Sequence, residues 1–180
     1  SIIDPVLSTY RTEFAREYFE LRRAKGMTED EAAKIMQDPL FFGAMLVRRG
    51  MADGMVAGAV NSTGNVLRAG FQIIGTAPGT AVVSSCFVMI NPAWPHGTNG
   101  MIVFGDCAVN PQPTAEQLAD IAVATAGTAR ALCGFEPHVA MLSYSTMGSG
   151  AGPDVDKVVA ALEIARGKAP DLQIDGPLQL

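Results

Sequence analysis

GMVAGAVNSTGNVLR, residues 54–68, is the stretch around which the rest of the sequence is organised. Its short apolar run at residues 55–57 predicts the end of a buried strand, and the small polar residues that follow predict a loop. The apolar segment 66–74 then predicts a helix with Arg68 in its first turn. The first amides of a helix have no partners within the helix, and the helix dipole adds partial positive charge at that end. This order of elements favours an anion site.

Four side chains in this stretch are candidates for binding an anion. Asn61, Ser62 and Thr63 offer hydrogen-bond donors, and the guanidinium of Arg68 is a planar fork that suits phosphate. An ordinary strand-to-helix turn, in which a hydroxyl only caps the helix, explains the same residue types. From the residues alone, both interpretations stay open.

Composition and charge limit the classes of protein. The chain has 180 residues, which suits one domain or one and a fraction, and its 48% apolar and 17% charged residues predict a buried core. The net charge of −5 gives no support for nucleic acid or an anionic membrane as a partner. No apolar run is long enough to span a bilayer, and the first residues, SIIDP, lack the pattern of a signal peptide.

The cysteines and histidines predict neither disulfides nor a metal site. Cys86, Cys107 and Cys133 are odd in number and widely spaced, which argues for a reducing compartment, so we expect a cytoplasmic protein. Neither the cysteines nor the two histidines, His96 and His138, have the paired spacing of metal ligands.

Helical periods and β-rich runs alternate along the chain, which predicts an α/β fold with a mostly parallel sheet. Thr28 with Glu31, and Thr114 with Gln117, are capping boxes that open two of the helices. A ten-residue loop between two β-rich runs predicts an antiparallel hairpin. The predicted helices span residues 6–25, 28–36, 39–49, 66–74, 114–133 and 154–168, and the predicted strands span residues 1–5, 55–57, 80–90, 101–104, 139–143 and 172–174.

A second polar loop follows the strand predicted at residues 139–143. It carries Ser145 and Thr146 and runs through several glycines into a predicted helix. It has no phosphate-loop lysine signature, so a flexible surface connection, or hydroxyls that only satisfy helix-start amides, explain it as well as a ligand site does. Asp106, at the end of another predicted strand, either lines a cleft or makes a turn with its own backbone.

Several uncommon strings make the whole chain resemble the phosphate acetyltransferase (phosphotransacetylase) family, within the phosphate acetyl/butyryl transferase superfamily. The strings are ELRRAKGMTEDEAAKIM (20–36), ADGMVAGAVNSTGNVLRAGFQIIGTAPG (52–79), FGDCAVNPQPTAEQLADIA (104–122), PHVAMLSYSTMGSGAGPDV (137–155) and APDLQIDGPLQL (169–180). The resemblance implies a three-layer α/β fold similar to isocitrate and isopropylmalate dehydrogenases, with two domains and the active site between them. Residues 1–78 then belong to the first domain and residues 79–180 to the second, without the family's N-terminal and C-terminal segments.

The resemblance also implies an activity, which is reversible transfer of an acetyl group between acetyl phosphate and coenzyme A. The coenzyme is a substrate whose own thiolate attacks the acetyl carbonyl, and no metal is implied. Arg68 and Arg22 match family arginines associated with the phosphoryl group and with coenzyme A, so they are the expected catalytic residues. The expected substrate-binding residues are Asn61, Ser62, Thr63, Ser145, Thr146 and Asp106.

Several alternatives remain beside this expectation. Arg22 lies next to Arg23, and a solvated pair of charges explains it without a function. The family's proposed general base lies in a segment that is not among these residues, so the chain could also be a noncatalytic acetyl-CoA-sensing module or a structural fragment. The resemblance implies a homodimer, which the Ala- and Gly-rich residues 118–132 and the apolar hairpin strands support, unless other parts of the same chain cover those faces.

Overall fold

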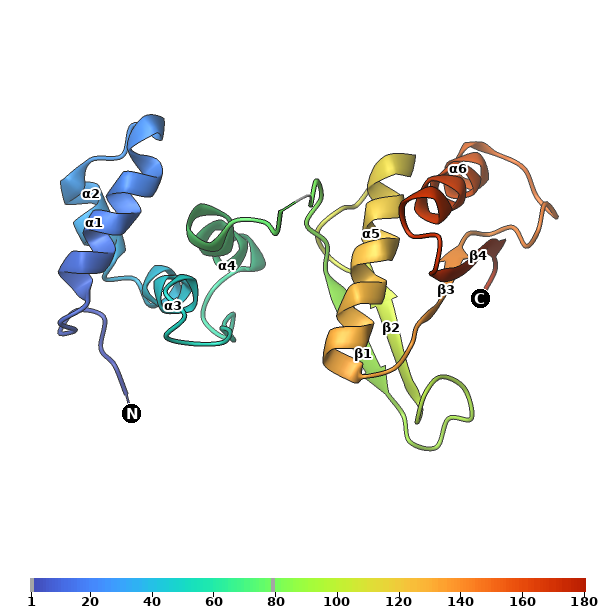
Figure 1. Cartoon of the computed structure of the whole chain (residues 1–180), viewed down its shortest axis with the longest axis horizontal. Helices are drawn as coiled ribbons and strands as arrows, with labels where there is room; N and C mark the ends of the chain where they lie inside the picture. Colours follow the sequence, from blue (N-terminus) through green and yellow to red (C-terminus); the bar gives the residue numbers. More distant parts are fainter. Residues whose placement is uncertain (1, 79) are drawn as a thin grey trace. The chain divides into compact units, whose positions relative to one another are not determined.

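The computed structural model of the chain describes residues 2–78 and 80–180. Its elements fall into two units, Ser1–Ala77 and Pro78–Leu180 (Figure 1). The described residues form helices, one antiparallel strand pair and one parallel strand pair, so the predicted α/β class is confirmed. Each unit has its own buried core.

All the regular elements that the structure describes in the first unit are helical, and local sequence sets most of their ends. Thr28 and Glu31 form the predicted capping box, and the Asp38 carboxylate accepts a hydrogen bond from the backbone N–H of Leu40. Gly26 ends the first helical stretch with a positive φ of 84°. The elements are α1 (Arg11–Arg22), η1 (Arg23–Lys25), α2 (Glu29–Ile35), α3 (Pro39–Arg48), α4 (Thr63–Ala69) and the π-helical turn η2 (Gly70–Ile74).

The first helix begins later than predicted, at Arg11 rather than near residue 6. Just before this helix, two short polar side chains accept hydrogen bonds from backbone N–H groups. The Asp4 carboxylate accepts a hydrogen bond from the Val6 N–H at 2.8 Å, and the Ser8 hydroxyl accepts one from the Tyr10 N–H at 3.2 Å. Such bonds offer the backbone a turn in place of a helix.

Aromatic and methionine side chains fill the core of the first unit. The ring of Phe14 on α1 packs on that of Phe42 on α3, with centroids 5.1 Å apart. Burial of each large apolar side chain stabilises the fold by about 1.5–3 kcal/mol, so this core holds α1, α3 and η2 together. Its largest fully buried side chains are Tyr18, Phe14, Met36, Met45 and Ile73.

The prediction of a strand at residues 55–57 is wrong. These residues are irregular, and Val56 is fully exposed. A strand needs a neighbouring edge for its backbone hydrogen bonds, and the described residues of the first unit contain no other strand. Residues 2–4 are irregular as well, and residue 1 of that predicted strand lies outside the described residues.

The second unit begins with the predicted hairpin. β1 (Cys86–Ile90) and β2 (Met101–Gly105) pair in antiparallel register, with Val88 opposite Val103 at the centre. The loop between them closes with a hydrogen bond of 2.9 Å from the Asn91 N–H to the carbonyl of Gly100.

The second strand pair is parallel, as its helical connection predicts. β3 (His138–Leu142) and β4 (Gln173–Leu178) are joined by the crossover helix α6 (Pro153–Lys168). β2 and β3 both line a cavity of about 670 Å³. Among the described strands, β1 pairs only with β2 and β3 only with β4, so they form two two-stranded sheets. The single, mostly parallel sheet predicted from the sequence is therefore not what these residues form.

Small side chains pack the two long helices of the second unit together. α5 (Ala115–Thr128) begins at the predicted capping box of Thr114 and Gln117 and continues into a π-helical turn, η3 (Ala129–Cys133). It packs on α6 and on the β3–β4 pair in one apolar cluster. Its most deeply buried members include Ala119, Ala126, Ala161, Leu162 and Ala165.

Candidate functional site

The polar loop of the first unit leads into α4. The helix begins at Thr63, three residues before the predicted start, because the Ser62 hydroxyl caps it by accepting a hydrogen bond from the Asn65 N–H at 3.3 Å. Arg68 therefore lies in the last turn of α4 rather than in the first turn, and it is exposed. Asn61 is half-buried and Thr63 is exposed. The Ser62 hydroxyl is thus used for capping, while Arg68 and Thr63 remain open to solvent.

Arg22, the last residue of α1, differs from its neighbour Arg23. Arg23 is a solvated residue, with 64% of its side chain exposed and an ion pair of 3.0 Å to Glu20. Arg22 is half-buried, and its Nε is buried without a hydrogen-bond partner among the described residues. The interpretation of the two arginines as a solvated pair therefore holds for Arg23 and not for Arg22.

A buried hydrogen bond joins the helix of Arg22 to the helix of Arg68. The Tyr18 hydroxyl donates to Oε1 of Gln72 at 2.5 Å, and the Tyr18 side chain is fully buried. Burial raises the pKa of Tyr18, and the nearby positive charge of Arg22 opposes that shift. Tyr18 lies four residues before Arg22, and Gln72 four residues after Arg68, so each lies on the same helix face as its arginine. The four-residue spacing from each arginine was the only feature of the sequence that pointed to Tyr18 or Gln72 as part of this region.

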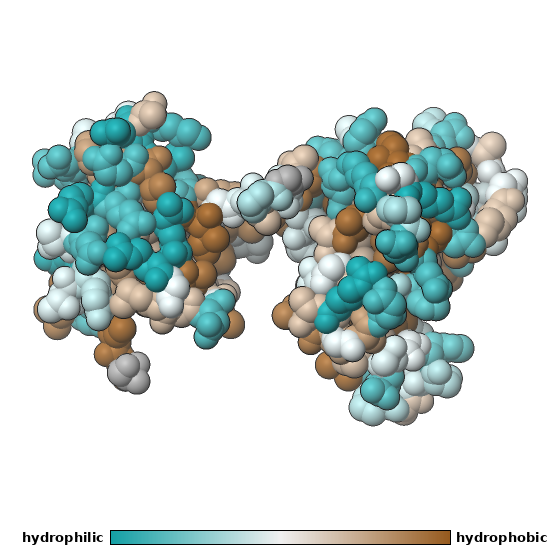
Figure 2. Space-filling model, viewed as in Figure 1, coloured by the Kyte–Doolittle hydropathy of each residue, from teal (hydrophilic) through white to brown (hydrophobic). Residues whose placement is uncertain are grey.

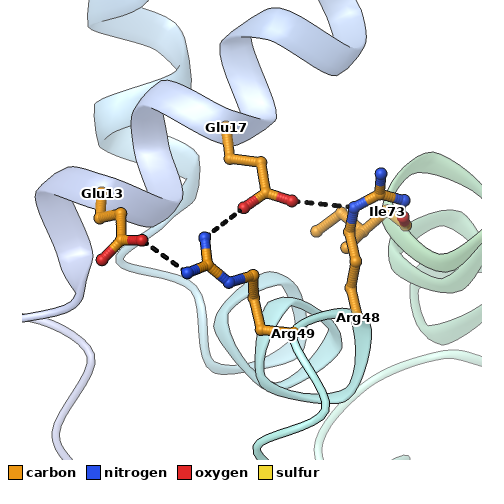
Figure 3. A network of polar contacts seen from close by, with 5 residues as sticks. All are labelled: Glu13, Glu17, Arg48, Arg49 and Ile73. Carbon is orange, nitrogen blue, oxygen red and sulfur yellow. Dashed lines mark hydrogen bonds and ion pairs between the residues drawn. The ribbon is translucent and has the colours of Figure 1, made fainter.

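Figure 3 shows a network of ion pairs beside this contact. Arg49 of α3 reaches Glu13 at 2.7 Å and Glu17 at 2.9 Å. Arg48 binds Glu17 through Nε at 3.0 Å and donates from Nη1 to the carbonyl of Ile73 at 2.7 Å. Burial on its own would raise the pKa of Glu17, but the two arginines lower it overall. The network therefore connects α1, α3 and η2, and sequence reasoning missed it.

In the second unit, the Asp106 carboxylate is surrounded by donors from its own neighbourhood. Its Oδ1 accepts from the N–H and hydroxyl of Ser85, and from the N–H groups of Ala108 (3.1 Å) and Val109 (3.3 Å). Its Oδ2 accepts from the backbone N–H of Asn110 at 2.7 Å and from its side-chain amide at 2.5 Å. Burial alone would raise the pKa of Asp106, but these hydrogen bonds hold it well below its usual range. Both oxygens thus brace the loop after β2.

The polar loop after β3 is braced in a similar way. Ser145 is fully buried, and its hydroxyl donates to the Gly150 carbonyl at 3.0 Å and accepts from the Gly150 N–H at 2.8 Å. Thr146 is exposed, and its hydroxyl accepts from the N–H of Gln179 at 3.0 Å. Neither hydroxyl caps α6, which begins at Pro153 with no side-chain cap.

The expected site residues thus form two sets. Arg22, Arg68 and residues 61–63 belong to the first unit, where side-chain contacts join the two helices that carry the arginines. Asp106, Ser145 and Thr146 belong to the second unit, on the loops that follow β2 and β3.

Residues 2–78 and 80–180 contain no group of three or more His, Cys, Asp or Glu side chains that could hold a metal ion. Cys86, Cys107 and Cys133 are half-buried free thiols, and burial raises the pKa of Cys86. Within the same described residues, no helix is both long and apolar enough to cross a membrane.

The sequence profile of the family described as phosphate acetyl/butaryl transferase matches residues 1–180. The chain belongs to this family. The resemblance inferred from the strings of the sequence is therefore confirmed. The chain is 55% identical over 179 residues to a phosphate acetyltransferase of Clostridium acetobutylicum, covering 99% of the chain and 54% of the relative. It is 51% identical to that of Thermoanaerobacterium thermosaccharolyticum, covering 55% of that relative.

Solved structures of the family agree in fold. A phosphotransacetylase from Streptococcus pyogenes superposes with a TM-score of 0.88 at 45% identity, over 99% of this chain and 52% of the other. The EutD phosphotransacetylase from Staphylococcus aureus gives a TM-score of 0.84 at 39% identity, over 98% of this chain and 52% of the other. The chain spans about half the length of these relatives.

Proposed function

We propose that the chain forms part of a phosphate acetyltransferase, which transfers an acetyl group reversibly between acetyl phosphate and coenzyme A. The observation that carries this proposal is the match to the transferase family along all 180 residues. The names of the relatives support it, since those at 55% and 51% identity are phosphate acetyltransferases. In this proposal Arg68 supplies the positive charge for the phosphoryl group of acetyl phosphate, and Arg22 supplies positive charge for coenzyme A.

In the proposed reaction, the thiolate sulfur of coenzyme A attacks the acetyl carbonyl carbon and forms a C–S bond. The C–O bond to phosphate breaks, and phosphate leaves with the electron pair. Arg68 binds the phosphoryl oxygens and stabilises the charge that collects on the leaving group, and Arg22 contacts coenzyme A. Asn61 and Thr63 lie at the N-terminal end of α4, the helix that carries Arg68, and bind the same substrate, while the Ser62 hydroxyl caps that helix. Coenzyme A is a substrate, and the chemistry uses no metal.

The second unit contributes differently in this proposal. The oxygens of Asp106 and Ser145 are occupied by hydrogen bonds with nearby groups of the same unit, so we assign both residues to loop shape rather than to direct contact with substrate. Thr146 is exposed and remains the substrate-binding candidate of that loop.

The proposal also includes the layers of the fold, the domain boundary and the cellular compartment. We propose a three-layer, dehydrogenase-like fold with two domains, the first including residues 1–78 and the second residues 79–180, although residue 79 lies outside the described residues. The division into units at Ala77 and Pro78 supports this boundary. We also propose that the enzyme works in the cytoplasm, as the unpaired cysteines suggest.

A homodimer is proposed from an apolar surface of the second unit. Apolar side chains reach the surface in Figure 2. On β1, Phe87 is 59%, Met89 53% and Ile90 64% exposed. Exposed apolar patches of more than a few hundred Å² usually mark interfaces. Light scattering on the full-length protein tests this, and a monomer without concentration dependence would rule it out.

Two measurements, one of turnover and one of binding, test the proposed function. The full-length protein is supplied with acetyl phosphate and coenzyme A, and thioester formation is followed by absorbance, alongside calorimetric binding of coenzyme A. We expect turnover that requires both substrates. Coenzyme A binding without turnover would instead indicate a noncatalytic sensing module, and no binding at all would indicate a structural role. The 180-residue chain in the same assay shows whether it is active alone.

A further inference from the structure

Two contacts in the first unit connect the helix that carries Arg22 with the helical segment that carries Arg68. The first is the hydrogen bond of 2.5 Å from the Tyr18 hydroxyl to Gln72. Each partner lies one helical turn from one of the arginines and on the same face. The contact spans 54 positions of sequence and is made by a fully buried side chain, so it fixes one helix face against the other.

The second contact runs beside the first along both elements. Glu17, which precedes Tyr18, binds Nε of Arg48 at 3.0 Å, and Nη1 of Arg48 binds the carbonyl of Ile73 at 2.7 Å (Figure 3). Ile73 lies near the end of the π-helical turn, where carbonyl groups lack partners within the helix. Arg48 therefore ties this turn to α1.

We propose that Gln72 and Arg48 are positioning residues for Arg68, acting through the two contacts that join α1 to η2, the turn that continues the helix of Arg68. We name the set Glu17, Tyr18, Arg48, Gln72 and Ile73 the α1–η2 clamp. The inference rests on the proposed function, because it assigns the phosphoryl group of acetyl phosphate to Arg68.

The need for a clamp follows from the arginines themselves. Arg22 and Arg68 come from different helices, so the spacing of their guanidinium groups depends on how α1 and η2 are held. A misplacement of about 1 Å in a positioning group can cost about 100-fold in rate, so small movements of η2 matter. Apolar packing by Ile73 keeps α1 and η2 together. Hydrogen bonds depend on the angle between donor and acceptor, so they also fix the orientation of one element against the other.

The decisive variant is Gln72→Leu in the full-length enzyme. It removes the acceptor of the Tyr18 hydroxyl and leaves the volume nearly unchanged. We expect the KM for acetyl phosphate to rise about tenfold while the KM for coenzyme A stays within about twofold. Gln72→Glu keeps an acceptor for the hydroxyl and should restore most of the acetyl phosphate KM. A purely structural role predicts equal effects on both substrates, and that result would overturn the proposal.

Arg48 and Arg49 offer a matched pair. Both lie at the end of α3 and both bind Glu17, but Arg48 alone of the two also binds the carbonyl of Ile73. We expect Arg48→Ala to raise the KM for acetyl phosphate several-fold and Arg49→Ala to leave it unchanged, with thermal midpoints recorded for both. If the two variants behave alike, the contact of Arg48 with η2 is not what positions Arg68.

Arg68→Ala, measured in parallel, separates this inference from the function on which it rests. Kinetics like those of the wild type in Arg68→Ala would remove that arginine from the site and so refute the proposed phosphate contact. An impaired Arg68→Ala together with unchanged Gln72→Leu and Arg48→Ala would overturn the clamp alone. Should Gln72→Leu fail to fold, the double variant Tyr18→Phe, Gln72→Leu removes the unpaired hydroxyl and carries the same KM prediction.

Discussion

The arginines of the first unit were predicted as catalytic residues and the oxygen-bearing side chains of the second unit as substrate-binding residues, and the two sets lie in different surroundings. Arg68 is exposed at the end of a short helix. The carboxylate of Asp106 and the hydroxyl of Ser145 instead accept hydrogen bonds from nearby groups of their own unit. A short polar side chain in a turn is close to several backbone N–H groups, whereas a guanidinium on a long stem reaches away from its backbone. The predictions below test this contrast.

The largest effect is expected at Arg68. In the full-length enzyme, Arg68→Ala removes a charged, two-pronged contact to phosphate, and kcat/KM for acetyl phosphate should fall by about 100- to 1,000-fold. Lysine should restore only part of this loss, because a point charge cannot form the same fork. Arg23→Ala is the control, since that arginine is a solvated surface residue, and it should retain the activity of the wild type. Equal activity in both alanine variants would contradict a phosphate role for Arg68.

At Asp106 we expect a change in stability and in its dependence on pH. The lowered pKa means that the carboxylate stabilises the fold above its unfolded-state pKa of about 3.9, and that this contribution is lost as the pH falls further. Asp106→Asn should therefore cost about 2 kcal/mol at pH 7, and it should flatten the loss of stability at acid pH. Urea denaturation at pH 7 and at about pH 2.5, below the unfolded-state pKa, measures both effects. An unchanged midpoint with a raised KM for acetyl phosphate would place Asp106 at the substrate instead.

Ser145→Ala should have a smaller effect of the same kind. The hydroxyl is the partner of both the N–H and the carbonyl of Gly150, and removing it leaves a buried N–H without that bond. We expect a loss of about 1–2 kcal/mol in the free energy of unfolding, with the KM for both substrates nearly unchanged. Thr146→Ala is the comparison, because its exposed side chain should affect KM more than stability. The reverse pattern in the two variants would exchange their roles.

The smallest effect is expected from the cysteines. Coenzyme A brings its own thiol to the proposed reaction, and burial raises the pKa of Cys86, which makes that thiol less reactive. A protein with Cys86, Cys107 and Cys133 all changed to Ser should keep its kcat within about twofold of the wild type. A folded triple variant that binds coenzyme A but no longer turns over would show that a protein thiol takes part.

Much of the helical structure was predictable because its signals are local. The capping boxes at Thr28 and Thr114 and the glycine stop at Gly26 act over a few residues and form as predicted. The start of α4 was predicted three residues too late. The prediction used the apolar residues from position 66 onward and did not use Ser62 as the cap of the helix. The strand at residues 55–57 failed for a different reason, since apolar residues favour a strand only where another strand offers its edge.

The sequence by itself determined the family, the α/β class, the hairpin and the arginines worth testing, because strings, periods and caps are properties of neighbouring residues. Only the tertiary structure decided which polar atoms are occupied and which stay open. The contact between Tyr18 and Gln72 joins residues 54 positions apart, and its partners are chosen by how the helices pack. The enclosure of Asp106 likewise depends on Ser85, 21 positions away. Long-range hydrogen bonds of this kind leave no period in a sequence, because their geometry exists only after the core has formed.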